Sequence, residues 1–361
     1  MLRTIDYAPL TTAVTPAEAK AFRQANQSSL RYSSGSTVAQ VVILVVVGTV
    51  FAFILLGFTG VIISIIVSVA EGGAGGGVAV LVFAVLFLGL IVLVVALAIR
   101  GVLGTGGRWV RWLRLDRFAR ANGLDFSPQD PNPQYPGAIF GQGRSRVAID
   151  HLRSATDRFL DYGNYRYVTG SGKNSTTHNW GFMALQLDRS LPHMVLDSKA
   201  NNGLFGGTNL PAIFTKDQVL SLEGDFDQYF TLYSPKQYER DALYVFTPDL
   251  MALLIDEAAP FDVEIIDKWM FVYSATPLDM SQPAIHQRLL RIVDTVGAKT
   301  LSQTDRYVDD RVVSFASNLV APAGQRLKRG VSIGAIIVLV GFAVIWLVPF
   351  LFDLFAVFLF R

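Results

Sequence analysis

The sequence from Val38 to Arg100 consists of two long apolar runs joined by the turn Glu71-Gly72-Gly73-Ala74-Gly75-Gly76-Gly77. Between Arg31 and Arg100 the only charged side chain is that of Glu71. Each run exceeds the roughly 20 apolar residues that cross a hydrocarbon core of ~30 Å. Because backbone groups in lipid must be hydrogen-bonded within their own segment, the pattern predicts a transmembrane helical hairpin over residues 38–103.

A third apolar run, Val331 to Leu351, predicts another membrane helix within the C-terminal part, residues 326–361. Asp353 splits the tail beyond this run, so a re-entrant C-terminus stays open beside a single crossing. Lysine and arginine occur before the first run and after the second but are missing from the glycine turn. The positive-inside rule therefore predicts that the N-terminal segment and the domain after Arg100 are cytoplasmic.

The segment over residues 104–125 predicts a basic juxtamembrane helix. From Arg100 to Arg120 there are six arginines against the single acidic residue Asp116, a charge of +5. Tryptophans at this position are typical of an interfacial aromatic belt, and the arginines suit contacts with lipid phosphates. The predicted membrane-interface residues are Arg108, Trp109, Arg111, Trp112, Arg114 and Arg117.

The N-terminal segment, residues 1–37, carries one clear helix signal. Thr15-Pro16-Ala17-Glu18 has the spacing of a capping box with proline at the first helical position. We expect a short helix from Pro16 to about Arg31.

Residues 126–325 predict a cytoplasmic α+β domain. The stretch from Ala121 to Gln325, which contains this domain, holds 17 Lys+Arg against 24 Asp+Glu, a charge of −7. This acidic balance argues against nucleic acid as the main partner. The chain has no cysteine, which removes disulfides, thiolate metal sites and cysteine nucleophiles. The predicted fold class is thus an α+β soluble domain tethered to an α-helical membrane part with three transmembrane helices.

The clearest local pattern in this domain is a β-hairpin. Residues 159–168 and 179–188 alternate or are rich in aromatic and β-branched side chains, and the glycine-containing stretch 169–176 separates them. A proline-rich link, residues 127–136, precedes the hairpin. Further predicted strands are 194–196, 219–222, 261–266 and 269–273, and helices are expected to start at Pro235 and Pro248 and to cover 283–304.

Three patterns bear on chemistry. Gly170-Ser171-Gly172-Lys173-Asn174 lacks the first glycine and the final Ser/Thr of a phosphate-binding loop, so it predicts a hairpin turn. Glu223, Asp225 and Asp227 alternate, so an extended chain places them on one face, either as ligands for Ca²⁺ or Mg²⁺ or as solvated edge charges. The four histidines show no metal-ligand spacing, and no cofactor motif is found.

Three stretches, 165–174, 191–197 and 222–226, resemble a group of uncharacterised multi-pass membrane proteins from actinobacteria. The resemblance covers roughly residues 126–273. It implies a bacterial plasma-membrane protein and assigns no catalytic residue.

The leading functional prediction is a membrane-tethered cytoplasmic module that binds a protein or regulates one, with the lipid bilayer and a protein partner or a second copy as its partners. One alternative is a carboxylate-based enzyme or divalent-ion-binding domain built on Glu223, Asp225 and Asp227. The other alternative is a subunit of an oligomeric channel or transporter. This alternative requires oligomerisation, because three uncharged helices do not enclose a polar path.

Overall fold

A computed structural model describes residues 4–29, 31–32, 48, 89, 107–155, 158–202, 208–212, 214–312 and 318–329. The chain divides into two compact units. The first, called the sheet unit, contains the described residues from 130 onward together with 4–5 and 122–125. The second, called the helical unit, contains the described residues of 6–121 together with 126–129.

The sheet unit is built on a seven-stranded sheet of order β1-β2-β3-β4-β6-β5, in which β7 pairs with β4 outside this path and the ladders from β2 onward are antiparallel. Strand β4 is the organising element, with 23 residues. It pairs with β3 along its first half and with β6 at its end, while β7 follows it along the other edge. The strands are β1 Leu124–Pro131, β2 Arg144–Ser154, β3 Leu160–Thr169, β4 Thr176–Ser198, β5 Val219–Leu220, β6 Phe230–Tyr233 and β7 Asp262–Ser274.

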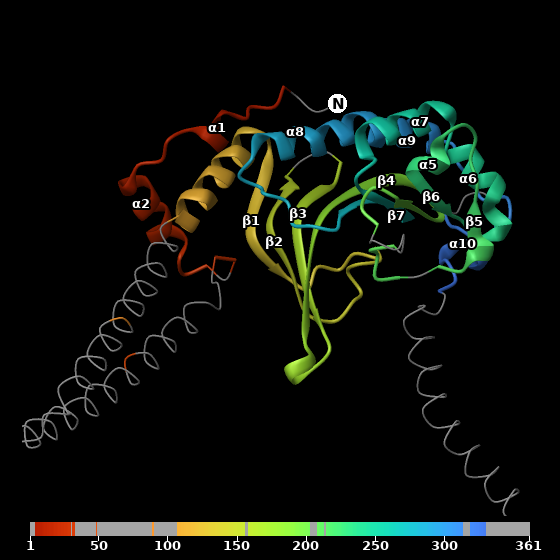
Figure 1. The fold of residues 1–361 in the computed structure, drawn as a ribbon. Helices are drawn as coiled ribbons and strands as arrows, with labels where there is room; N and C mark the ends of the chain where they lie inside the picture. Colours follow the sequence, from red (N-terminus) through yellow and green to blue (C-terminus); the bar gives the residue numbers. More distant parts are fainter. Residues whose placement is uncertain are drawn as a thin grey trace, which may run out of the picture. The chain divides into compact units, whose positions relative to one another are not determined.

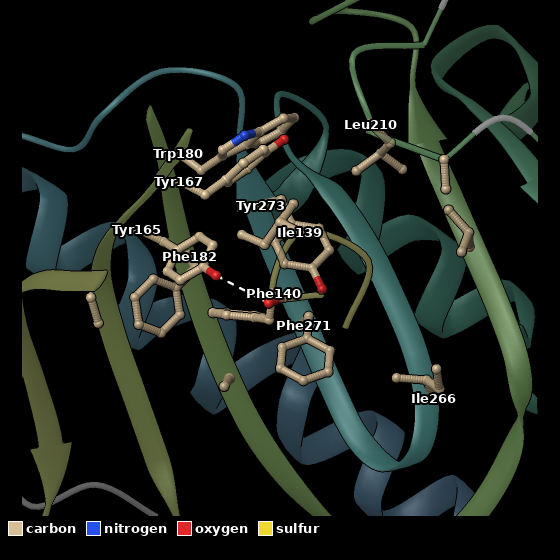
Figure 2. Packing of buried hydrophobic residues seen from close by; sticks show 14 of the residues in the cluster. Ile139, Phe140, Tyr165, Tyr167, Trp180, Phe182, Leu210, Ile266, Phe271 and Tyr273 are labelled. Carbon is tan, nitrogen blue, oxygen red and sulfur yellow. Dashed lines mark hydrogen bonds between the residues drawn. The ribbon is translucent and has the colours of Figure 1, made fainter. Parts of the chain in front are cut away.

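Both faces of the sheet are buried. One face carries an aromatic cluster that includes Tyr165, Phe182, Phe271 and Tyr273, all 0–1% exposed. Figure 2 shows these rings packed around Phe140, which comes from the connection between β1 and β2 and meets them in tilted or edge-on contacts. The Tyr165 hydroxyl donates to the Phe140 carbonyl over 3.1 Å, so the connection is fixed to the sheet at its centre.

The other face is covered by helices, and Figure 1 shows α7, α8 and α9 lying together beside the sheet. A Cβ added to Gly297 would meet Leu185 of β4, so this part of the chain packs directly on the strands. The helical elements are α5 Phe226–Tyr229, α6 Glu239–Val245, α7 Pro248–Leu253, α8 Pro283–Ile292, α9 Ala298–Thr304 and α10 Pro322–Gln325, with the π-helical turns η4 Leu254–Ala258 and η5 Val293–Gly297. Three short 3₁₀ turns are η1 Gly172–Asn174, η2 Lys216–Gln218 and η3 Lys236–Tyr238.

The helical unit contains α1 Ala8–Thr11, α2 Pro16–Asn26 and a helix over residues 107–121. The predicted capping box is confirmed: the Thr15 side chain accepts from the Glu18 N–H, and the Glu18 carboxylate accepts from the Thr15 N–H. That backbone bond, followed by the Arg117 guanidinium, lowers the pKa of Glu18 to about 2. Helix α2 ends at Asn26, several residues before the predicted end at Arg31.

Several predicted elements are confirmed and others are wrong in their limits. The hairpin is present as β3 and β4, and the helix over 283–304 is present as α8, η5 and α9. The expected strands 179–188 and 194–196 belong to one strand, β4, and 261–266 and 269–273 both belong to β7. Asp267 interrupts the latter pattern with a φ of 52°, which turns the chain locally without ending the ladder. Part of the proline-rich link is strand β1.

The predicted fold class requires correction. The described fold is an α+β fold dominated by an antiparallel sheet, and in the described residues no helix is both long enough and apolar enough to cross a membrane. This finding contradicts the predicted three-helix membrane part and removes the structural basis for a multi-pass plasma-membrane localisation. The predicted spans in 38–103 and 331–351 lie outside the described residues, apart from Gly48 and Gly89.

Candidate functional site at the hairpin end of the sheet

The β3–β4 hairpin projects from one end of the sheet (Figure 1). Its turn depends on Gly170 for two reasons. The φ of 73° lies in the left-handed region that favours glycine, and a Cβ at this position would collide with the Asn174 carbonyl oxygen. Across the hairpin, Thr169 Oγ1 and His178 Nε2 are hydrogen-bonded at 2.8 Å, and the His178 ring stacks on Tyr167 with centroids 4.7 Å apart. These contacts give the projecting hairpin a defined shape.

Four cationic residues belong to the strands and the turn at this end of the sheet, and together they are called the hairpin-end surface. Arg144 and Arg166 lie on one face of the sheet, whereas Arg146 lies on the face of the aromatic cluster. Arg144 lies opposite Val168 in the β2–β3 ladder, and Arg166 stands two positions from Val168 on β3. Strand spacing places the two arginine Cα atoms about 8 Å apart. The hairpin-end surface consists of Arg144, Arg146, Arg166 and Lys173, of which Arg146 is half-buried and the other three are exposed.

The charges of this surface are not balanced by carboxylates. In the described residues no ion pair involves any of the four side chains. Arg144 donates to the Gly170 carbonyl over 3.1 Å and Arg146 to the Phe140 carbonyl over 3.2 Å. A guanidinium has five N–H donors, so most of them stay available. The stretches 131–149 and 162–187, which include this end of the sheet, contain no aspartate or glutamate.

Placing like charges together carries a cost. Two unit charges about 8 Å apart in water repel by roughly 0.5 kcal/mol, and salt screens part of this. Neutral polar residues at these positions would remove the repulsion. An acid-free cationic surface can bind an anionic group, since arginine matches carboxylate and phosphate geometry.

Two buried acid–imidazole pairs have the composition of a catalytic acid–base pair. Asp161 contacts His151 Nδ1 at 2.7 Å, the Tyr135 hydroxyl at 2.6 Å and the Arg153 guanidinium at 3.0 Å. Burial acts against its ionisation, but His151 and Arg153 lower the pKa of Asp161 overall. Asp161 is 0% exposed and His151 2% exposed, so this pair cannot reach a substrate.

The second pair, Glu264 and His193, is fully occupied by structural bonds. Glu264 accepts from His193 at 2.8 Å, from the Tyr273 hydroxyl at 2.6 Å and from the Ala138 N–H at 2.7 Å. His193 Nδ1 accepts from the Leu327 N–H at 3.0 Å, which assigns the ring hydrogen to Nε2. The pair therefore links the β1–β2 connection and the C-terminal segment to the sheet.

A cavity of about 360 Å³ lies beside the turn of β7. Its polar groups are largely engaged with one another: Ser190 bonds to Asn318 through both its N–H and its hydroxyl, and Asp267 pairs with Arg326. It therefore offers little recognition chemistry beyond Lys268. The lining residues are Ser190, Asp267, Lys268, Trp269, Asn318, Leu319, Val320 and Gln325.

The predicted acidic triad is not carried by one extended strand. Strand β5 ends at Leu220, Gly224 adopts a φ of 71°, and α5 begins at Phe226. Glu223 and Asp225 are exposed, and Asp227 accepts from Ser221 and from the Leu222 N–H. In the described residues no group of three or more His, Cys, Asp or Glu side chains is arranged to hold a metal ion.

The predicted membrane-interface residues lie within the helical unit. Trp109 and Trp112 are 8% and 3% exposed, and Tyr32 packs against both indoles. Arg114 donates to the Thr12 carbonyl over 3.1 Å, and Arg117 pairs with Glu18. Arg108 stacks over the Trp112 ring at 5.1 Å, and Arg111 is exposed. The two indoles are thus used for packing within this unit.

Sequence reasoning missed the hairpin-end surface. Of its members only Lys173 was singled out, inside the rejected phosphate-loop pattern. The signal that was available is negative: two stretches of sequence free of acidic residues in a domain that is otherwise acidic.

No family model matches the chain, and no curated protein matches it. A solved structure with some similarity is the crystal structure of the mycobacterial trehalose monomycolate transport factor A, TtfA, which shares 14% identity. The match covers 51% of this chain and 91% of that chain, with a TM-score of 0.35. A likeness of this strength does not determine what the present chain binds. The resemblance to actinobacterial membrane proteins stays a prediction.

Proposed function

We propose that this protein is a non-enzymatic binding module whose sheet unit binds an acidic segment of a partner protein through the hairpin-end surface. The observation that carries the proposal is that the exposed cationic side chains of Arg144, Arg166 and Lys173 have no carboxylate partner in the described residues. The absence of acidic residues from the surrounding stretches supports it, because nothing there competes with an anionic ligand.

The charge distribution favours a short acidic peptide segment over a nucleic acid. A long polyanion would extend from the hairpin onto a domain whose overall charge is −7 over residues 121–325 and would be repelled there. Single-stranded nucleic acids also need exposed aromatic rings for base stacking. The aromatic side chains nearest the hairpin, Tyr167 and Trp180, are only 2% and 5% exposed.

Fluorescence anisotropy with a labelled oligoglutamate peptide tests the proposal. The full chain is titrated against this peptide, against an uncharged glycine–serine peptide of equal length and against an oligonucleotide of equal charge. The triple variant Arg144→Gln, Arg166→Gln, Lys173→Gln is expected to bind oligoglutamate at least roughly tenfold more weakly, since each exposed charge contact contributes up to ~1 kcal/mol. Salt should weaken the wild-type affinity.

A matched control separates a local surface from net charge. The variant Lys216→Gln, Lys236→Gln, Arg240→Gln removes three exposed positive charges elsewhere on the sheet unit and should keep wild-type affinity. Equal losses in the two triple variants would refute the proposal, and so would tighter binding of the oligonucleotide than of the peptide. Sedimentation of the protein alone adds a check: self-association abolished by the hairpin triple variant would assign the surface to a second copy instead.

A further inference from the structure

Strand β4 has an open edge where the β3–β4 hairpin extends beyond β7. On one side β4 pairs with β3 from Thr176 to Leu185, in a ladder without register shifts. On the other side its ladder with β7 begins at Gly181, which lies opposite Ser274. Among the described residues, 176–179 therefore form a strand segment with a ladder partner on one side only. Figure 1 shows the end of the hairpin projecting past the neighbouring strands.

The backbone groups of Thr177 and Asn179 point toward this open edge. In antiparallel strands, opposed residues alternate between pairs that exchange both hydrogen bonds and pairs that exchange none. One step beyond the end of the β3–β4 register, Gln186 donates its N–H to the Phe159 carbonyl over 3.0 Å, which identifies a hydrogen-bonded pair. Counting back from this pair, Thr177 and Asn179 both belong to pairs of the other kind. Their N–H and carbonyl groups therefore face away from β3.

The chain that follows β7 turns away from this edge. The Asn164 side chain donates to the Leu278 carbonyl over 2.9 Å and accepts from the Leu278 N–H over 2.6 Å. Because Asn164 belongs to β3 and a Cβ at Gly181 would collide with Leu278, this chain crosses over the sheet at Gly181. Residues 176–179 stay exposed apart from His178, which is half-buried. They include neither proline, lysine nor a bulge, the features that commonly protect an edge strand.

Two cations of the hairpin-end surface stand close to the open edge. Arg166 is the β3 partner of Asn179, so its side chain lies on the sheet face that Thr177 and Asn179 share. Neighbouring strands are about 4.8 Å apart, so a strand added to the open edge lies roughly 10 Å from β3. The long side chains of an arginine and a glutamate can meet across this distance over the short Asn179. Lys173 is exposed in the turn that joins the two strands.

We propose that the acidic partner segment adds to this edge of β4 as an antiparallel β-strand, in line with β7. The inference rests on the proposed function and adds the conformation in which the segment binds. Thr177 and Asn179 supply backbone hydrogen bonds, while Arg166 and Lys173 recognise acidic side chains on one face of the added strand. Antiparallel pairing matches the β4–β7 ladder on the same edge. Since alternate residues of a strand face the same side, the segment carries acidic residues at every second position.

Labelled peptides of one composition test the strand conformation by fluorescence anisotropy with the full chain. In one peptide glutamate and threonine alternate, and in the other the same residues form two blocks. The alternating peptide should bind roughly fivefold more tightly, because only alternation places its acids on the face of Arg166.

N-methylation of the alternating peptide then locates its backbone hydrogen bonds. In antiparallel pairing, the residues opposite Thr177 and Asn179 direct their N–H groups toward β4, and these residues are the glutamates. Methylating the glutamate nitrogens should weaken binding by at least roughly tenfold, whereas methylating the threonine nitrogens should leave the affinity within about twofold.

A proline variant tests the same edge from the side of the protein. Thr177→Pro removes an N–H that faces away from β3, so it removes no bond of the β3–β4 ladder, and it should weaken binding by roughly tenfold. The matched control Thr4→Pro makes the same change at an exposed threonine outside the strands and should bind like the wild type. Melting temperatures compare the folding of the two variants, and the methylated peptides need no variant at all.

The outcomes separate this inference from the proposed function. Equal binding of the alternating and block peptides, equal losses with the two methylation patterns, or wild-type affinity in a folded Thr177→Pro would each overturn the strand conformation. Self-association that Thr177→Pro abolishes, without binding of either peptide, would overturn it in favour of a second copy at this edge. The proposed function itself fails only when the triple charge variant keeps wild-type affinity for oligoglutamate or loses no more than its matched control.

Discussion

Replacing Asp262 by asparagine should stabilise the sheet unit, by an amount that grows with pH. The carboxyl is 0% exposed, and an amide of nearly the same size keeps the bond from the Ser198 N–H through its oxygen. Its nitrogen then supplies a donor in place of the unsatisfied Oδ2. The substitution therefore removes a buried carboxylate next to Asp197 without leaving a cavity.

The magnitude follows from the pKa of the carboxyl in the folded and unfolded chain. Burial and Asp197 raise the pKa of Asp262 from its ordinary value of 3.8 to about 7. Between these values the folded protein holds a proton that the unfolded chain has released, so the free energy of unfolding of wild type falls as the pH rises. About three pH units at ~1.4 kcal/mol each give a loss of ~4 kcal/mol. Asparagine binds no proton and suffers no such loss.

The assay is urea unfolding in the presence of EDTA, followed by tryptophan fluorescence at several values between pH 4 and 8. The stability difference between Asp262→Asn and wild type should grow by roughly 4 kcal/mol across this range and level off above pH 7. Asp197 is present in both proteins, so its own titration largely cancels in the difference. Hydrogen exchange of the Ser198 amide gives a local check. Parallel stability curves for the two proteins would refute the reasoning.

Three further predictions concern other parts of the chain. Thr15→Ala removes a helix cap and should cost about 1 kcal/mol, seen as faster amide exchange in the first turn of α2, whereas an unchanged rate would show that the cap does not hold this turn. Gly170→Ala should destabilise the hairpin by about 1–3 kcal/mol, because alanine must adopt a φ of 73° and collide with Asn174; chemical shifts confined to residues 165–180 would locate the effect, and wild-type stability would contradict it. Glu264→Ala should lower the free energy of unfolding by about 3–5 kcal/mol, and Tyr273→Phe, which removes only one hydroxyl, should lower it by about 1–2 kcal/mol. Denaturant midpoints rank the two variants, and the reverse order would contradict the linking role of Glu264.

Local sequence signals predicted the elements whose determinants lie within a few residues of one another. The capping box at Thr15 needs only Glu18 three positions later, and both bonds are present. The β3–β4 hairpin needs two alternating segments and a glycine turn, all between residues 159 and 188. The amphipathic spacing over 283–304 likewise predicted helical structure from side-chain period alone.

Strand limits could not be predicted in this way. Strand β4 continues through Arg189 and Ser190, and strand β7 continues through Asp267, because the two strands pair with each other on both sides of these residues. The polar residues that read as strand ends are irregularities inside a long antiparallel pair. Such a pairing joins residues 67 to 93 positions apart, so no local window contains the information.

The relative positions of the acidic side chains depend on tertiary structure for the same reason. Glu223, Asp225 and Asp227 alternate in sequence, yet a left-handed Gly224 and the start of α5 prevent an extended arrangement. Asp197 and Asp262 show no sequence motif and become opposed only through the β4–β7 register. Local pattern is sufficient to predict the β3–β4 hairpin and the helix cap at Thr15, whereas the pairing of distant strands sets which charges meet. Alternation and capping are local interactions, while strand register is set by burying both faces of the sheet at once.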